Sequence, residues 1–146
     1  MEKQRKLLKE YSVVILIFVA ISLVKMIVEL CLYGFSLSGL GVEGIDEQLV
    51  KIVSVIVFVI ALLFLIPDFY VGVKGIKEAN APTGARAHIV WSLILAILYT
   101  IGTVSSAIDL VNGVNLDKVL DALNVALDAI VFFGYYFVAK KVANAK

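Results

Sequence analysis

Long apolar stretches separated by short polar segments dominate the pattern of the chain. The clearest is the uncharged run from Ile89 to Ile108, which as an α-helix is about 30 Å long and long enough to cross a bilayer once. Three other stretches have the same character, although charged residues interrupt two of them. The pattern predicts four transmembrane helices, at residues 12–35, 52–73, 88–110 and 118–139.

The segments between these stretches are short and carry turn-forming residues. Pro82 and Gly84 lie in the second connection, and Gly113 lies in the third. No connection is long enough to separate two domains. We therefore expect an all-α fold in which residues 1–146 form a single four-span membrane domain, an antiparallel four-helix bundle.

Composition supports a membrane environment for this chain. Hydrophobic residues make up 62% of it and charged residues 17%, with a mean hydropathy of +1.02. A soluble domain carries nearer half apolar and a quarter charged residues. The net charge of +1 gives no reason to expect a nucleic-acid partner.

Basic residues predict the orientation of the four helices. Only Lys51 and Lys118 belong to one side, whereas the other side holds Lys3, Arg5, Lys6, Lys9, Lys74, Lys77, Arg86, Lys140, Lys141 and Lys146. Cytoplasmic segments of membrane proteins are enriched in lysine and arginine. We therefore expect a multi-pass protein of the cell membrane with both termini in the cytoplasm.

Ionisable residues inside the predicted spans are the main candidates for a functional site. Lys25 and Glu29 share one face of the first span, and the fourth span carries a polar stripe of Asp117, Asp121, Asn124 and Asp128. Counted from the outer helix ends, Lys25 and Asp128 lie at the same depth, about 15 Å in. We expect an ion pair between them beside an outward-facing polar cavity, formed by Lys25, Glu29, Asp109, Asp121, Asn124 and Asp128.

A structural role for the same residues is the alternative. An intramembrane lysine–aspartate pair can serve only to fix helix register and packing.

Tyr99 is the one polar aromatic residue at mid-depth, where it would cap the cavity. Asp68 follows Pro67 close to a span end, so we expect there either a helix kink or a carboxylate that extends to the surface beside Lys74. We expect His88 to lie at the interface.

Enzymatic chemistry finds little support in the sequence. Asp121 and Asp128 are seven residues apart on one helix, about 10 Å, which is too far for a dyad that shares a proton. A single cysteine, Cys31, and a single histidine, His88, provide neither a disulfide nor a metal cluster. No phosphate-binding glycine loop is present. We expect no catalytic residues, no cofactor and no metal site.

Two functional hypotheses remain at this stage. In the first, the chain is a non-enzymatic membrane subunit, scaffold or sensor, whose partner is a membrane protein or a second copy of itself. In the second, it is a small transporter, channel or solute-binding unit whose outward cavity accepts a cation or a proton. Replacing Lys25 and Asp128 by apolar residues would separate the two, because a scaffold would tolerate the change and a transport site would not.

Overall fold

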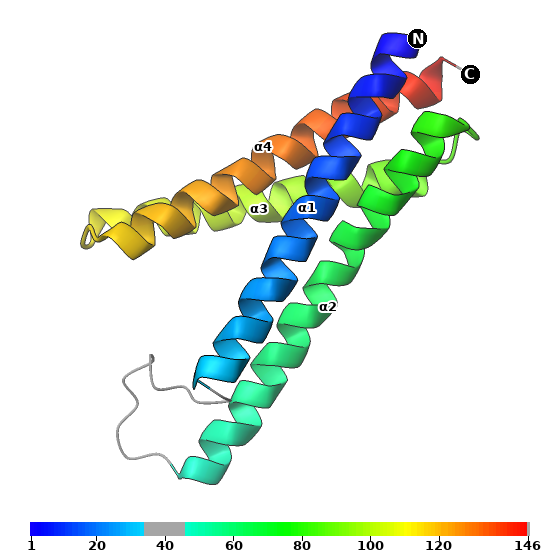
Figure 1. Cartoon of the computed structure of the whole chain (residues 1–146). Coiled ribbons are helices and arrows are strands. Elements are labelled where there is room, and N and C mark those ends of the chain that lie inside the picture. The colour runs from blue at the N-terminus through cyan, green and yellow to red at the C-terminus, as the bar shows by residue number, and fades with distance from the viewer. Residues whose placement is uncertain (34–45, 146) are drawn as a thin grey trace.

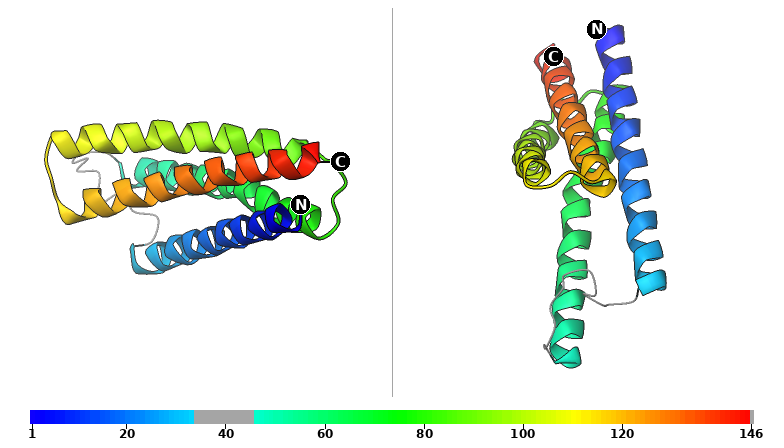
Figure 2. Two further views of the ribbon diagram at one scale, coloured as in Figure 1. Left: turned by 90° about the horizontal axis from the view of Figure 1, so that it is seen from above. Right: turned by 90° about the vertical axis from the view of Figure 1, so that its left-hand side faces the viewer.

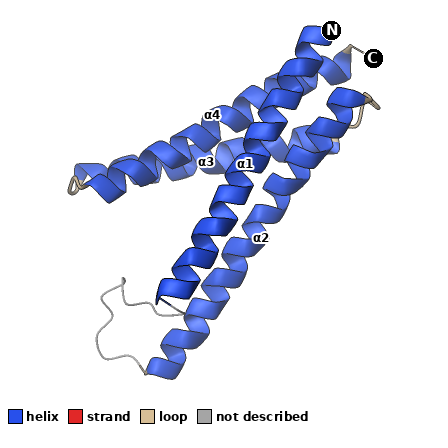
Figure 3. Ribbon diagram, in the orientation of Figure 1, coloured by secondary structure: helices blue, strands red, loops and turns tan. Residues whose placement is uncertain are grey.

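The structure is a computed structural model that describes residues 1–33 and 46–145. This part of the chain folds into four α-helices: α1 (Glu2–Tyr33), α2 (Glu47–Asn80), α3 (Ala87–Val111) and α4 (Leu116–Asn144) (Figure 3). Each helix is long and apolar enough to cross a membrane. The all-α class and the four predicted helices are confirmed, and four candidate membrane-spanning helices suggest a multi-pass membrane protein.

The helices extend beyond the predicted spans because polar residues continue them. α1 begins at Glu2, well before its apolar part, and α2 continues past its apolar part to Asn80. Lysine, glutamate and arginine are good helix formers, so the change from apolar to polar residues does not end a helix. The predicted end of the first span, at residues 34–35, lies outside the described residues.

Side-chain caps fix the starts of two helices. The carboxylate of Asp46 accepts a hydrogen bond from the backbone N–H of Gln48 at 3.2 Å, at the start of α2. The side-chain oxygen of Asn115 accepts one from the N–H of Lys118 at 2.8 Å, at the start of α4. Asparagine and aspartate are favoured in this position because they satisfy N–H groups that have no partner within the helix.

The four helices form two antiparallel hairpins that meet at one end. α1 and α2 make the first hairpin, and α3 and α4 make the second (Figure 1). The hairpins pack together at the end that holds both chain termini and the α2–α3 connection, which we call the terminal end. They diverge from there, as the views in Figure 2 also show. The antiparallel order is as predicted, but the hairpins do not stay side by side along their whole length.

Nearly all buried residues lie where the hairpins meet. Leu8, Ser12, Ile15 and Val19 are buried on α1 at spacings of three and four residues, which places them on one face of the helix. Among the described residues, Ser54 is the one buried residue outside this region. We call the packed region the junction and the parts of the hairpins beyond it the arms; the junction comprises residues 2–19, 68–80, 87–99 and 129–144.

Glycines let the helices of the junction approach closely. A Cβ atom at Gly72 would lie 2.7 Å from Cδ2 of Leu16, and one at Gly134 would lie 2.6 Å from Cε1 of Tyr11. A Cβ atom at Gly75 would meet Ser12 and would lie 2.6 Å from Cε2 of Tyr135. These glycines therefore pack α2 and α4 against α1 within one chain, in the way that small residues do between membrane helices.

Hydrogen bonds hold the terminal end together. The carboxylate of Glu78 accepts hydrogen bonds from the N–H groups of Thr83 and Gly84, at 2.8 and 3.2 Å, and from the Thr83 hydroxyl group. Arg5 of α1 donates to the carbonyl oxygens of Ala79 and Asn80, at 2.7 and 2.6 Å. A cation at the carboxyl end of a helix satisfies free carbonyl groups and the helix dipole, so Arg5 caps α2.

Candidate functional site

Polar side chains are buried in the junction, and most of them are satisfied locally. The Ser12 hydroxyl group donates to the carbonyl oxygen of Leu8 at 2.6 Å, and that of Ser92 donates to the carbonyl oxygen of Ile89 at 2.7 Å. Both bonds stay within one helix. Glu78 is satisfied by the α2–α3 connection. None of these three groups has free capacity that would mark a binding site.

Asp68 is different, because its carboxylate is buried and only half satisfied. The residue is 5% exposed, and the hydroxyl group of Tyr99 donates a hydrogen bond of 2.5 Å to its Oδ2 atom. Its Oδ1 atom has no hydrogen-bond partner among the described residues. A polar atom that is buried without a partner is rare in proteins and needs an explanation. A bound proton or ion at this atom is one such explanation.

A second carboxylate lies near this pair. Asp128 of α4 is half-buried and close enough to interact electrostatically with both Asp68 and Tyr99. The ring of Tyr99 stacks on Phe132 of α4, with centroids 5.4 Å apart and an angle of 23° between the planes. Three helices from both hairpins therefore contribute to one group of side chains, which we call the Asp68 cluster: Asp68, Tyr99, Asp128 and Phe132.

No described basic side chain neutralises the Asp68 cluster. Within residues 1–33 and 46–145, the one ion pair is that between Lys25 and Glu29, at 3.9 Å. Asp68 and Asp128 therefore have no lysine, arginine or histidine of this part of the chain within ion-pair distance. Two carboxylates that share a poorly hydrated site cannot both stay charged without a large energetic cost, so the cluster is suited to holding a proton or a small cation.

His88 and Tyr135 form a second buried contact, nearer the terminal end. The Tyr135 hydroxyl group donates to the carbonyl oxygen of Val71 at 3.1 Å and lies 2.6 Å from Nδ1 of His88. Which of the two atoms donates in the shorter contact depends on the tautomer of the imidazole ring. The three residues link α2, α3 and α4, and the contact is satisfied without an additional ligand.

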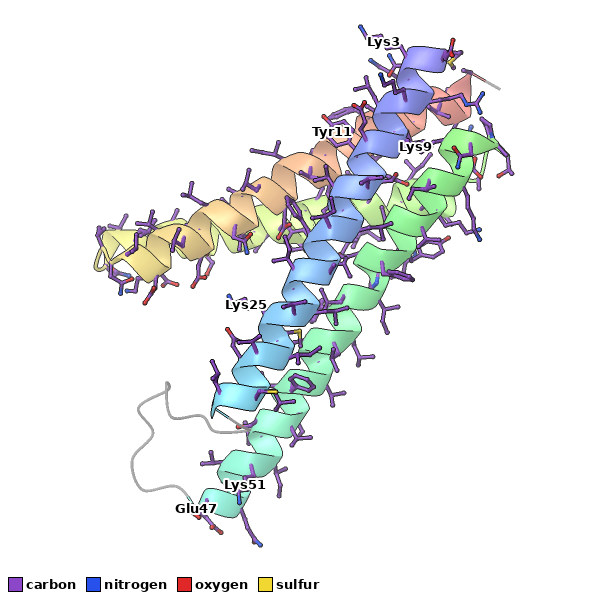
Figure 4. All side chains as sticks on the ribbon, in the orientation of Figure 1. Lys3, Lys9, Tyr11, Lys25, Glu47 and Lys51 are labelled. Carbon is purple, nitrogen blue, oxygen red and sulfur yellow. The ribbon has the colours of Figure 1, made fainter. Side chains whose placement is uncertain are left out.

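The structure separates the residues of the predicted ion pair. Lys25 lies on the arm of α1 (Figure 4). It pairs with Glu29, and the two side chains are 61% and 57% exposed. Asp128 lies instead beside Asp68 and Tyr99. The Lys25–Asp128 pair does not form, because the hairpins diverge beyond the junction and carry α1 away from α4 at this level.

The other residues of the predicted cavity lie on the surface of the arms. Asp109 on α3 and Asp121 and Asn124 on α4 are exposed. The structure thus joins one of the six predicted residues, Asp128, to a buried polar group, and leaves the other five at the surface. A cavity that all six would line stays a prediction.

One prediction about a single residue is wrong: the Asp68 carboxylate does not extend to the surface beside Lys74, because it is buried against Tyr99. His88 lies at the start of α3, where it is 2% exposed and in contact with Tyr135, and its position at a membrane interface stays a prediction. A signal for Asp68 exists in the sequence: it lies four residues before Gly72 and seven before Gly75, which places all three on one closely packed helix face.

Neither a metal centre nor a known relative identifies the site. Among the described residues, no three histidine, cysteine, aspartate or glutamate side chains are grouped so that they could hold a metal ion. Comparisons of the chain with protein-family models, with curated proteins and with solved structures find no match. Functional inference therefore depends on the chemistry of the site itself.

Proposed function

We propose that the chain is a small, non-enzymatic membrane transport protein that binds a proton or a monovalent cation at Asp68. The observation that supports this proposal is the buried Asp68 carboxylate, whose Oδ1 atom is unpartnered among the described residues and which has no basic neighbour there. Ionisable residues within membrane spans are costly and are typical of ion pathways and proton relays. A proton or cation bound to Oδ1 would give this atom its missing partner and would neutralise the charge of the Asp68 carboxylate.

The position of the cluster suggests how binding would act on the rest of the molecule. Asp68 belongs to the first hairpin, whereas Tyr99 and Asp128 belong to the second. Repulsion between the two carboxylates would push the hairpins apart, and neutralising Asp68 would remove it. A ligand that binds one arrangement better than another shifts the population between them. Occupancy of Asp68 would therefore couple to the angle between the hairpins.

We also propose that the terminal end faces the cytoplasm, in the cell membrane. The described helices place most of their basic residues at that end: Lys3, Arg5, Lys6, Lys9, Lys74, Lys77, Arg86, Lys140 and Lys141. This distribution is the one that orients membrane proteins during insertion. In this orientation the Asp68 cluster would lie in the cytoplasmic half of the protein.

Proton flux into liposomes tests the function directly. The purified protein is reconstituted in vesicles that enclose pyranine, and a potassium gradient with valinomycin imposes a potential that is negative inside. We expect internal acidification that depends on the protein and that Asp68→Asn abolishes, because the amide cannot exchange a proton. Asp109→Asn makes the same chemical change at an exposed residue and should leave the flux unchanged.

Sodium and rubidium uptake are measured in the same vesicles to separate a proton from a cation. Circular dichroism confirms that each variant is folded. Equal fluxes of all tested ions in Asp68→Asn and the unmodified protein would overturn the assignment of Asp68. A loss that Asp109→Asn shares would indicate a general effect of surface charge.

A membrane subunit or scaffold is the second candidate, and the Lys25–Glu29 pair favours it. Both side chains are more than half exposed on an apolar arm. A charged residue at the centre of a membrane helix costs roughly 2.5 to 3.5 kcal/mol, so a partner helix that covers the pair would be favoured. Replacing Lys25 and Glu29 together by methionine would then abolish assembly in a light-scattering measurement of mass, whereas a transporter that acts alone would keep its flux.

A further inference from the structure

A groove lies between the start of α3 and the end of α4, at the terminal end of the molecule. Its volume is about 190 Å³. Apolar and polar side chains both line it. The apolar residues are Ile89, Val90, Leu93 and Ala143, and the polar ones are Arg86, Tyr136, Lys140 and Asn144.

Two cations line the groove. Arg86 and Lys140 are exposed, and Nζ of Lys140 lies 5.7 Å from the centre of the Tyr136 ring. Within the part of the chain that the structure describes, no carboxylate lies within ion-pair distance of either residue. The Tyr136 hydroxyl group and the Asn144 amide add neutral donors beside this positive charge.

We propose that this groove binds one anionic phospholipid, with its phosphate between Arg86 and Lys140 and an acyl chain along Val90 and Leu93. The guanidinium fork of arginine matches the geometry of a phosphate group, and lysine adds a second positive charge. Basic pockets between membrane helices at a cytoplasmic surface are suited to acidic lipid head groups. The apolar walls favour a lipid over a soluble phosphate ester, because a soluble ester would leave them exposed to water. This site does not depend on Asp68.

The only tryptophan of the chain provides a direct probe. Trp91 does not line the groove, but it follows the lining residue Val90 on α3 and is 44% exposed, so its indole ring can report on lipids beside this part of α3. Bromine atoms on an acyl chain quench tryptophan fluorescence on contact. The protein is reconstituted in phosphatidylcholine vesicles with increasing fractions of brominated phosphatidylglycerol, and separately with brominated phosphatidylcholine. The two quenching curves give the preference for the anionic lipid.

We expect the unmodified protein to prefer phosphatidylglycerol over phosphatidylcholine, and we expect Arg86 and Lys140 each to contribute to this preference. A basic residue near an anionic lipid contributes about fivefold in affinity, so Arg86→Gln and Lys140→Gln should each reduce the preference by about that factor. The double variant should remove nearly all of it. Lys140→Arg keeps the charge and should restore most of the effect.

Lys141→Gln is the matched control, because it removes the same charge from the adjacent exposed position, which does not line the groove. An equal loss in Lys141→Gln and Lys140→Gln would overturn the proposal and indicate diffuse attraction to the membrane surface. The absence of any preference in the unmodified protein would also overturn it. If millimolar glycerol phosphate cancels the preference, the groove binds soluble phosphate esters, and the assignment to a lipid is wrong.

Discussion

The hydroxyl group of Tyr99 donates a hydrogen bond of 2.5 Å to the carboxylate of Asp68 and so joins α3 of one hairpin to α2 of the other. The same tyrosine ring stacks on Phe132 of α4. One side chain therefore positions the candidate carboxylate and also contributes to the packing of the junction. Changes at Tyr99 should therefore affect both the stability of the junction and ion binding at Asp68.

Tyr99→Phe removes the hydrogen bond and keeps the ring. We expect the free energy of unfolding to fall by about 1.5 to 3 kcal/mol, because a hydrogen bond to a carboxylate in the protein interior is lost. Denaturation in detergent followed by circular dichroism measures the change. Tyr70→Phe is the control, since the structure assigns no hydrogen bond to the Tyr70 hydroxyl group, and its effect should stay within about 0.5 kcal/mol. Equal stability of the two variants would contradict the role given to Tyr99.

Gly75→Ala should destabilise the junction. The added methyl group would lie 2.6 Å from Cε2 of Tyr135 and would also meet Ser12, so α1 and α4 would have to move. Overpacking of this kind costs about 1 to 3 kcal/mol, which exceeds the gain in helix propensity of about 1 kcal/mol. Thermal unfolding in detergent would show it. The methyl group of Gly113→Ala would meet no atom closer than 3.9 Å, so this variant serves as the control. If Gly75→Ala leaves the stability unchanged, the close approach of α1 and α2 is wrong.

Tyr135→Phe should leave the Nδ1 atom of His88 buried without its hydrogen-bond partner. The cost is about 1 to 3 kcal/mol of stability, typical of an unsatisfied buried polar group. A double-mutant cycle with His88→Ala isolates the contact, and we expect a coupling energy of at least about 0.5 kcal/mol. Additive effects of the two substitutions would show that the His88–Tyr135 contact contributes little.

Arg5→Gln should loosen the terminal end, because it removes the two bonds from Arg5 to the last turn of α2. We expect a loss of about 1 to 2 kcal/mol, which is typical of a lost helix cap or of charge-assisted hydrogen bonds. Hydrogen exchange at Ala81, whose N–H group bonds to the carbonyl oxygen of Lys77, should become faster. Lys6→Gln removes the same charge from an exposed neighbour and should change neither quantity.

Hydrophobic patterning was sufficient to predict the four helices. The run from Ile89 to Ile108 lies wholly within α3, and the turn at Pro82 and Gly84 falls between α2 and α3 as expected. These features depend on local sequence, because a membrane-crossing segment must satisfy its own backbone hydrogen bonds and therefore becomes a helix. Helix ends were less accurate, since polar residues such as Glu2 and Lys77 continue the helices beyond the apolar parts.

The position of the candidate site could not be predicted in the same way. Counting residues from the outer helix ends places Lys25 and Asp128 at equal depth, but depth alone does not determine whether two helices touch. The angle between the hairpins depends on which side chains form ridges on a helix and where small residues leave gaps between them. Gly72, Gly75 and Gly134 leave the main gaps here. Their contacts join α1, α2 and α4 near the termini and thereby bury Asp68 instead.

The divergence of the two hairpins has a consequence for the bilayer itself. The molecule is narrow where its termini meet and broad where its arms separate (Figure 1). Inserted in a bilayer, it would occupy a larger cross-sectional area in the leaflet around the arms than in the leaflet around the terminal end. Such a wedge is accommodated most easily by a curved membrane, and several copies placed side by side would bend a flat one.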